Sequence, residues 1–161
     1  TDDIKINPIF ENSLQNSGIV LAGANSYNVD SLQDGYLTAY EISRLDWDGV
    51  ELVVISGCQS SEGDLLFGEG LYGLKRAIKV AGARASLLSL WEVDDEATSV
   101  FMQTFYKFLS SGFSKTEDLK LTQSHFREGK IKSNDPENKD WGKPYYWAGF
   151  QLSGDWKPIK L

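Results

Sequence analysis

The chain has 161 residues, with only one cysteine, one histidine and four prolines. A single cysteine excludes an internal disulfide, so nothing in the sequence indicates an oxidising compartment. No apolar run approaches the ~18 residues that a membrane-spanning helix needs, and the first residues, TDDIKINPIF, do not have the pattern of a signal peptide. We therefore expect a soluble, cytoplasmic protein that has no membrane partner.

Basic residues are also scarce, because 16 Lys and Arg face 23 Asp and Glu, which gives a net charge of −7. An acidic surface repels both phosphate backbones and anionic lipids, so we do not expect nucleic acid as a partner. No group of residues has the ligand spacing of a transition-metal site, and we expect neither a metal nor another cofactor. A hydrophobic content of 41% is typical of a globular protein, and the length fits a single domain over residues 1–161.

The hydrophobic pattern predicts an α/β domain with a largely parallel sheet. Apolar runs predict buried strands over residues 18–23, 51–56 and 85–90, and an aromatic-rich last strand over 146–152. Helical spacing and capping residues predict helices over 38–44, 71–81, 95–109 and 114–127. We expect residues 1–17 to be an irregular lead-in and 128–144 to be an exposed loop.

The stretch ELVVISGCQSSE, residues 51–62, is the centre of the sequence. Its unbroken apolar run, 52–55, predicts a strand buried on both faces of a parallel sheet. Gly57 and Cys58 follow at the carboxyl end of that strand, where open α/β sheets place their chemistry. From these features alone, Cys58 is either a nucleophile or an inert, buried thiol.

Two other features of the sequence have both a functional and a structural interpretation. Residues 68–73 match the pattern G-x-G-x-x-G, but a dinucleotide site needs these glycines directly after a strand, and here residues 57–67 intervene. We therefore do not expect nucleotide binding. His125 falls near the end of a helix, where a cationic side chain needs no further role, and nothing in the sequence places it beside Cys58.

Four acidic residues cluster after the third strand: Glu92, Asp94, Asp95 and Glu96. They can cap the next helix and stabilise its dipole, or they can line a pocket beside the thiol and bind a basic side chain. Adjacent strands lie ~4.8 Å apart, so the ends of two neighbouring strands can share one site. Both interpretations can hold, with one residue capping the helix and another lining the site.

Several segments together resemble a known family: SGIVLAGAN, DGYLTAYEISRLDW, ELVVISGCQSSEGD, GEGLYGLKRAIKVAGARASLLSLWEVDDEATSVFMQTFYKFL and PYYWAGFQLSGDW. They resemble the CHAT family of caspase-like, clan CD cysteine peptidases, which usually follow tetratricopeptide repeats. The resemblance covers about residues 17–156. It implies a caspase-hemoglobinase fold, a three-layer α/β/α sandwich with a mostly parallel sheet, and the N-terminal strands of that sheet are absent from this chain.

The resemblance also implies residue roles. Cys58 would be the nucleophile of a Cys–His dyad that cleaves peptide bonds, and its backbone N–H, next to Gly57, would form part of the oxyanion hole. The substrate would be a protein or peptide. The residues implied in substrate binding are Gln59, Trp91, Glu92, Asp94 and Asp95. Their acidic members suit a basic P1 residue, Lys or Arg, better than Asp.

The family's dyad histidine lies in a His-Gly pair before the SGIVLAGAN region, and this chain does not contain that pair. We expect the chain to be the C-terminal portion of a CHAT peptidase domain, inactive by itself. Its histidine would come from a segment upstream of Thr1, and tetratricopeptide repeats would be a further partner. The alternative is a catalytically inactive scaffold or interaction module that keeps the fold.

Overall fold

The computed structural model describes residues 14, 17–21, 24, 35–56, 69–133 and 139–159. The chain divides into two compact units. Unit 1 consists of Thr1–Val50 and Glu62–Ala83, and unit 2 consists of Glu51–Ser61 and Arg84–Leu161.

Unit 1 contains a two-stranded antiparallel ribbon, β1 (Gly18–Val20) with β2 (Tyr36–Thr38). The prediction of a buried strand at 18–23 is wrong, since β1 is short and Val20 is 50% exposed. A two-stranded ribbon has no further strand neighbour, so its residues keep much of their exposure to solvent. β2 was not predicted, because its three residues run directly into the start of a helix.

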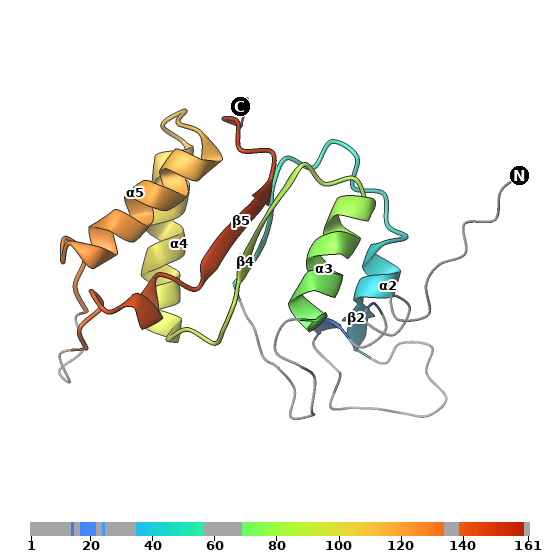
Figure 1. Ribbon diagram of the computed structural model, residues 1–161, viewed down its shortest axis with the longest axis horizontal. Coiled ribbons are helices and arrows are strands. Elements are labelled where there is room, and N and C mark those ends of the chain that lie inside the picture. Colours follow the sequence, from blue (N-terminus) through green and yellow to red (C-terminus); the bar gives the residue numbers. More distant parts are fainter. Residues whose placement is uncertain are drawn as a thin grey trace, which may run out of the picture. The chain divides into compact units, whose positions relative to one another are not determined.

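That helix is α2 (Ala39–Ile42), and its predicted capping box is confirmed. Thr38 Oγ1 accepts a hydrogen bond from the Glu41 N–H at 3.2 Å, and the Glu41 carboxylate accepts one from the Thr38 N–H at 2.8 Å. Ala39 and Ile42 are buried, and α2 packs beside α3 (Glu69–Val80), as Figure 1 shows.

Helix α3 buries one face and ends where the sequence predicted. Leu74, Ala77 and Ile78 are buried at helical spacing. Gly82 has φ +107°, a left-handed conformation that favours glycine, and a Cβ at this position would lie 3.0 Å from the backbone nitrogen of Asp48. Gly82 therefore both ends the helix and permits the close approach of the chain at residue 48.

Unit 2 contains a three-stranded sheet in the order β3 (Val53–Ile55), β4 (Ala85–Ser89), β5 (Phe150–Gly154). β3 and β4 are parallel, and β4 and β5 are antiparallel. Helices and this sheet confirm the α/β class. All five residues of β4 are buried, whereas β3 is only half-buried, so the prediction that β3 is buried on both faces is wrong. Among the described residues β3 pairs with β4 alone, which leaves it at the edge of the sheet.

The last strand begins later than predicted, at Phe150 rather than at Tyr146. Residues Pro144–Tyr146 form a short 3₁₀ helix, η2, instead. Pro144 explains the difference, because its fixed φ suits the start of a helical turn and it has no N–H to donate to a sheet.

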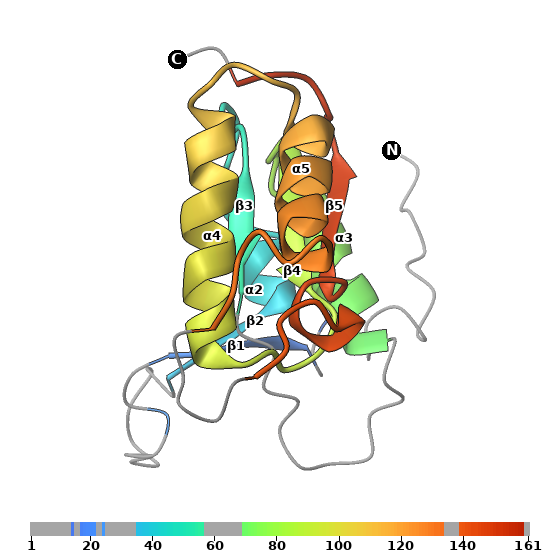
Figure 2. The same ribbon diagram turned by 90° about the vertical axis from the view of Figure 1, so that its left-hand side faces the viewer.

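Helices α4 (Asp95–Leu109) and α5 (Lys115–Arg127) lie side by side on one face of this sheet (Figures 1 and 2). Phe101 of α4 stacks on Phe150 of β5 with ring centroids 4.0 Å apart, and Phe126 of α5 lies 5.4 Å from Phe101. Trp141 stacks on Phe126 at 5.9 Å and is 2% exposed. The loop over 128–144 is therefore not exposed throughout, since it contributes a tryptophan to the core.

Helix α5 also buries two charged side chains, Lys115 and Asp118. Lys115 Nζ lies 3.7 Å from Oε2 of Glu51, and the other carboxylate oxygen of Glu51, Oε1, accepts a hydrogen bond from Arg84 at 2.8 Å. Neither carboxylate oxygen of Asp118 has a hydrogen-bond donor in the structure described above. Burial raises the pKa of Asp118, and the neighbouring charge of Glu117 raises this pKa further.

Candidate functional site

The strand register brings three segments to one edge of the unit 2 sheet. Ile55, the last residue of β3, pairs with Leu88 of β4, and Ser89, the last residue of β4, pairs with Phe150, the first of β5. The carboxyl ends of β3 and β4 and the amino end of β5 therefore lie together. The predicted site residues Gly57, Cys58 and Gln59 follow β3 in the sequence but lie outside the described residues. The structure describes the residues that follow β4 and those that precede β5. We call three aromatic residues in these segments, Trp91, Tyr145 and Tyr146, the wall of the candidate site.

Trp91 is the centre of this wall, and the segment before β5 fixes its orientation. Its indole N–H donates a hydrogen bond to the carbonyl oxygen of Tyr145 at 3.0 Å. Its ring lies so close to Gly149 that a Cβ there would be 2.9 Å from Trp91 Cε2. The neighbouring N–H of Leu90 donates to the Gly149 carbonyl at 2.7 Å. Trp91 is therefore held by residues more than fifty positions later in the chain.

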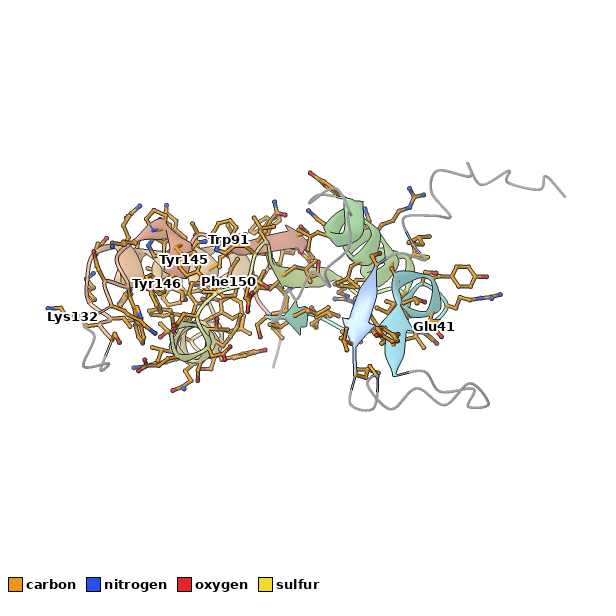
Figure 3. All side chains as sticks on the ribbon, turned by 90° about the horizontal axis from the view of Figure 1, so that it is seen from below. Glu41, Trp91, Lys132, Tyr145, Tyr146 and Phe150 are labelled. Atoms are coloured by element: carbon orange, nitrogen blue, oxygen red, sulfur yellow. The ribbon has the colours of Figure 1, made fainter. Side chains whose placement is uncertain are left out.

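Two tyrosines extend the wall. Figure 3 shows Trp91, Tyr145, Tyr146 and Phe150 gathered in one region of unit 2. The rings of Tyr145 and Tyr146 meet edge to face, 5.1 Å between centroids, and Tyr145 is 51% exposed. Aromatic faces of this kind contact apolar side chains and attract cations. Neither tyrosine was predicted as a site residue, since Tyr146 was assigned to the strand over 146–152 and Tyr145 lies just before that range; Pro144 was the available signal.

Asp94 caps helix α4 and carries out two tasks at once. One carboxylate oxygen accepts a hydrogen bond from the Ala97 N–H at 3.0 Å, and the other accepts one from Lys139 Nζ at 2.9 Å. Both hydrogen bonds lower the pKa of Asp94, and the one from the Ala97 N–H has the larger effect. The capping interpretation is thus confirmed for Asp94, whose basic partner here is a lysine of this same chain.

The side chains of the two other acidic residues predicted in substrate binding form no hydrogen bond or ion pair with another described residue, and Asp95 lies in the first turn of α4. Glu92 and Asp95 are exposed on the segment that follows Trp91. Because Asp94 is engaged by Lys139, the negative charge that this segment offers to solvent comes from Glu92, Asp95 and Glu96.

His125 has its interactions within the α4–α5 pair. Its Nδ1 lies 2.9 Å from the Leu121 carbonyl oxygen, and its ring meets Phe108 edge to face at 5.2 Å. Over the described ranges, no group of three or more His, Cys, Asp and Glu is arranged to hold a metal ion. In the same ranges, no helix combines the length and the apolar character that crossing a bilayer requires.

Comparison with known proteins identifies the family. The sequence model of the CHAT domain family matches residues 6–155 of this chain. The chain belongs to the CHAT domain family. Tetratricopeptide repeat protein 28 of Homo sapiens is 33% identical over 127 residues, which cover 76% of this chain and 4% of that protein. The protein of the same name from Mus musculus has the same identity over the same length and is covered to 5%.

The match to the family and the names of the two relatives therefore confirm the predicted family and its association with tetratricopeptide repeat proteins. The α/β fold of the described residues agrees with the caspase-like fold that the family implies. The chain spans only about one twentieth of the length of these two relatives.

Proposed function

We propose that this CHAT domain is the nucleophile-bearing part of a cysteine endopeptidase, with Cys58 as the nucleophile. The observation that supports the proposal is the register of β3 on β4. Cys58 follows Ile55 by three positions in the sequence, and Ile55 ends at the same sheet edge as the strand that leads to Trp91. A thiol that follows such a strand in the sequence suits attack on a bound peptide, because the carboxyl ends of parallel strands are where α/β sheets place their chemistry.

In the proposed reaction, the Cys58 thiolate attacks the scissile carbonyl carbon and forms a C–S bond. The backbone N–H of Cys58 donates to the developing oxyanion. The C–N bond then breaks, the leaving amine takes a proton from the dyad histidine, and water hydrolyses the thioester. That histidine would come from a segment of the natural protein that precedes Thr1, because the ring of His125 interacts with Leu121 and Phe108.

The preference for a basic P1 residue is part of this proposal. Glu92 and Asp95 are exposed on the segment that follows Trp91, and their carboxylates attract a lysine or arginine side chain. Matched peptides that differ only in P1 test this preference in the complete natural protein. Cleavage after Arg is expected to exceed cleavage after Asp, and cleavage after Asp alone would refute the assignment.

The test of the nucleophile is substitution of Cys58 in the complete natural protein. Cys58→Ala and Cys58→Ser should each abolish turnover and leave the circular dichroism spectrum and thermal midpoint unchanged. Cleavage that persists in Cys58→Ala would refute the peptidase assignment.

The second candidate function is a scaffold or interaction module without catalysis. It is favoured by the relatives, whose name refers to tetratricopeptide repeats and to no peptidase activity. Under this alternative, tetratricopeptide repeats of the same protein would be the partner. Cys58→Ala would then leave every measurable property of the complete protein unchanged, whereas the peptidase proposal requires loss of turnover.

A further inference from the structure

Helix α3 exposes the two most exposed large hydrophobic side chains among the described residues. Tyr72 is 71% exposed and Val80 is 61% exposed. At about 100° per residue, Tyr72, Arg76, Lys79 and Val80 fall within roughly 100° of the helix circumference. The buried residues Leu74, Ala77 and Ile78 occupy the opposite side. We call the first four residues the Tyr72 face.

The Tyr72 face is basic in a chain that is acidic. The whole chain has a net charge of −7, yet residues 70–91 contain no Asp or Glu. In the helical projection Arg76 lies between the two apolar side chains, Lys79 flanks Tyr72 on the other side, and Lys75 lies at the border of the face. Exposed apolar groups interleaved with positive charge are typical of a surface that binds a negatively charged, partly apolar partner.

The helix does not need this face for its own packing. Its buried side supplies the apolar contacts of unit 1, where α3 packs beside α2 (Figure 1). Tyr72 and Val80 at about two thirds exposure add little to folding, since hydrophobic stabilisation scales with the apolar area removed from water.

We propose that the Tyr72 face is a docking surface for an acidic segment of a partner protein. An apolar side chain of that segment would contact Tyr72 and Val80, and its carboxylates would pair with Lys79. A protein is favoured over an anionic membrane for two reasons. The face has no Trp, Phe or Leu to insert between lipids, and the net charge of −7 opposes binding to an anionic bilayer. This proposal does not depend on catalysis by Cys58.

In the test, displayed random 16-residue peptides are selected for binding to the complete natural protein. Peptides that also bind its Tyr72→Ser/Lys79→Glu variant are then removed. Fluorescence anisotropy of the enriched peptides then gives Kd. The matched control is Tyr106→Ser/Lys107→Glu, which changes an exposed tyrosine and an exposed lysine of α4. We expect enriched peptides rich in Asp and Glu with an apolar residue. Their Kd should rise by about tenfold or more in the Tyr72 variant, stay within about twofold in the control, and rise with salt.

Three results would overturn the proposal. In the first, the selection yields no peptide, or yields peptides without an acidic excess. In the second, the α4 control loses as much affinity as the Tyr72 variant. In the third, phosphatidylserine vesicles bind the natural protein but not the Tyr72 variant, while no peptide binds. If the double variant loses its cooperative thermal transition, Tyr72→Ser alone takes its place. The same criteria then apply.

Discussion

Replacing Gly149 with alanine perturbs the wall of the candidate site at one point. The backbone of Gly149 is outside the left-handed region, so alanine fits its conformation without strain. The new Cβ would lie 2.9 Å from Trp91 Cε2 and 3.2 Å from Trp91 Cζ2 and Nε1. The three heavy atoms nearest to the new Cβ all belong to Trp91, so the main cost of the substitution arises from this contact.

The contact distances set the size of the effect. Packed carbon atoms lie about 3.5–4.0 Å apart, so the indole must move by roughly 0.6–1 Å. Overpacking of this kind costs about 1–3 kcal/mol. Movement of the ring also weakens its 3.0 Å hydrogen bond to Tyr145, which adds about 0.5–1.5 kcal/mol at most. Since Trp91 is half-buried and can move outward, we expect a loss near the lower end, about 2 kcal/mol.

Urea unfolding followed by circular dichroism measures this loss. Gly70→Ala is the matched control, because the one described atom that its Cβ would meet is Ser17 Cβ at 3.7 Å, an ordinary contact. It lies in α3, where alanine is favoured over glycine by up to about 1 kcal/mol, so it should not destabilise. The cost of Gly149→Ala should shrink in a Trp91→Phe background, because phenylalanine lacks part of the indole. A Gly149→Ala variant as stable as the wild type, or equally costly in both backgrounds, would refute the reasoning.

Three further predictions concern charge and capping. Asp118→Asn should gain stability relative to the wild type as the pH rises from 3 to 7. The raised pKa of Asp118 means that its ionisation in the folded state opposes folding above its ordinary pKa of 3.8, and a difference independent of pH would contradict this. Lys139→Met should cost about 0.5–1 kcal/mol at pH 7 and less at pH 2, because the lowered pKa of Asp94 contributes stability that is present above its ordinary value of 3.8 and is lost as the pH falls through the lowered value; equal costs at both pH values in urea unfolding would argue against the ion pair. Ser114→Ala should cost about 1 kcal/mol by removing the cap of α5, whereas Ser110→Ala, past the end of α4, should cost less; the reverse order would be inconsistent with the capping box.

Local signals in the sequence were enough for most helices. The capping boxes at Thr38 and Ser114 lie within four residues of sequence, and both are present. The bounds of α4, 95–109, agree with the prediction, since Asp94 caps the first turn and Gly112 follows the last. These features depend only on neighbours in the chain, and sequence patterns report such neighbours directly.

Non-local pairing explains what the sequence did not predict. The ribbon of β1 and β2 needs partners about twenty residues apart, and the ion pair of Asp94 with Lys139 joins residues 45 positions apart. The place of Trp141 in the core depends likewise on Phe126, in the preceding helix. For the site, the family resemblance implied a substrate-binding role for Trp91, which stays a prediction, and nothing in the sequence pattern indicated the tyrosines of η2 that lie near it.

Covalent capture of Cys58 tests the central claim most directly. The complete natural protein is incubated with a peptide acyloxymethyl ketone that ends in Arg, and the modified residue is located by mass spectrometry of the digested chain. The account predicts a thioether at Cys58 that forms faster with this reagent than with its matched Asp analogue and is absent in Cys58→Ala. Peptide cleavage by a protein whose Cys58 stays unmodified by either reagent, while another residue is labelled, would contradict it.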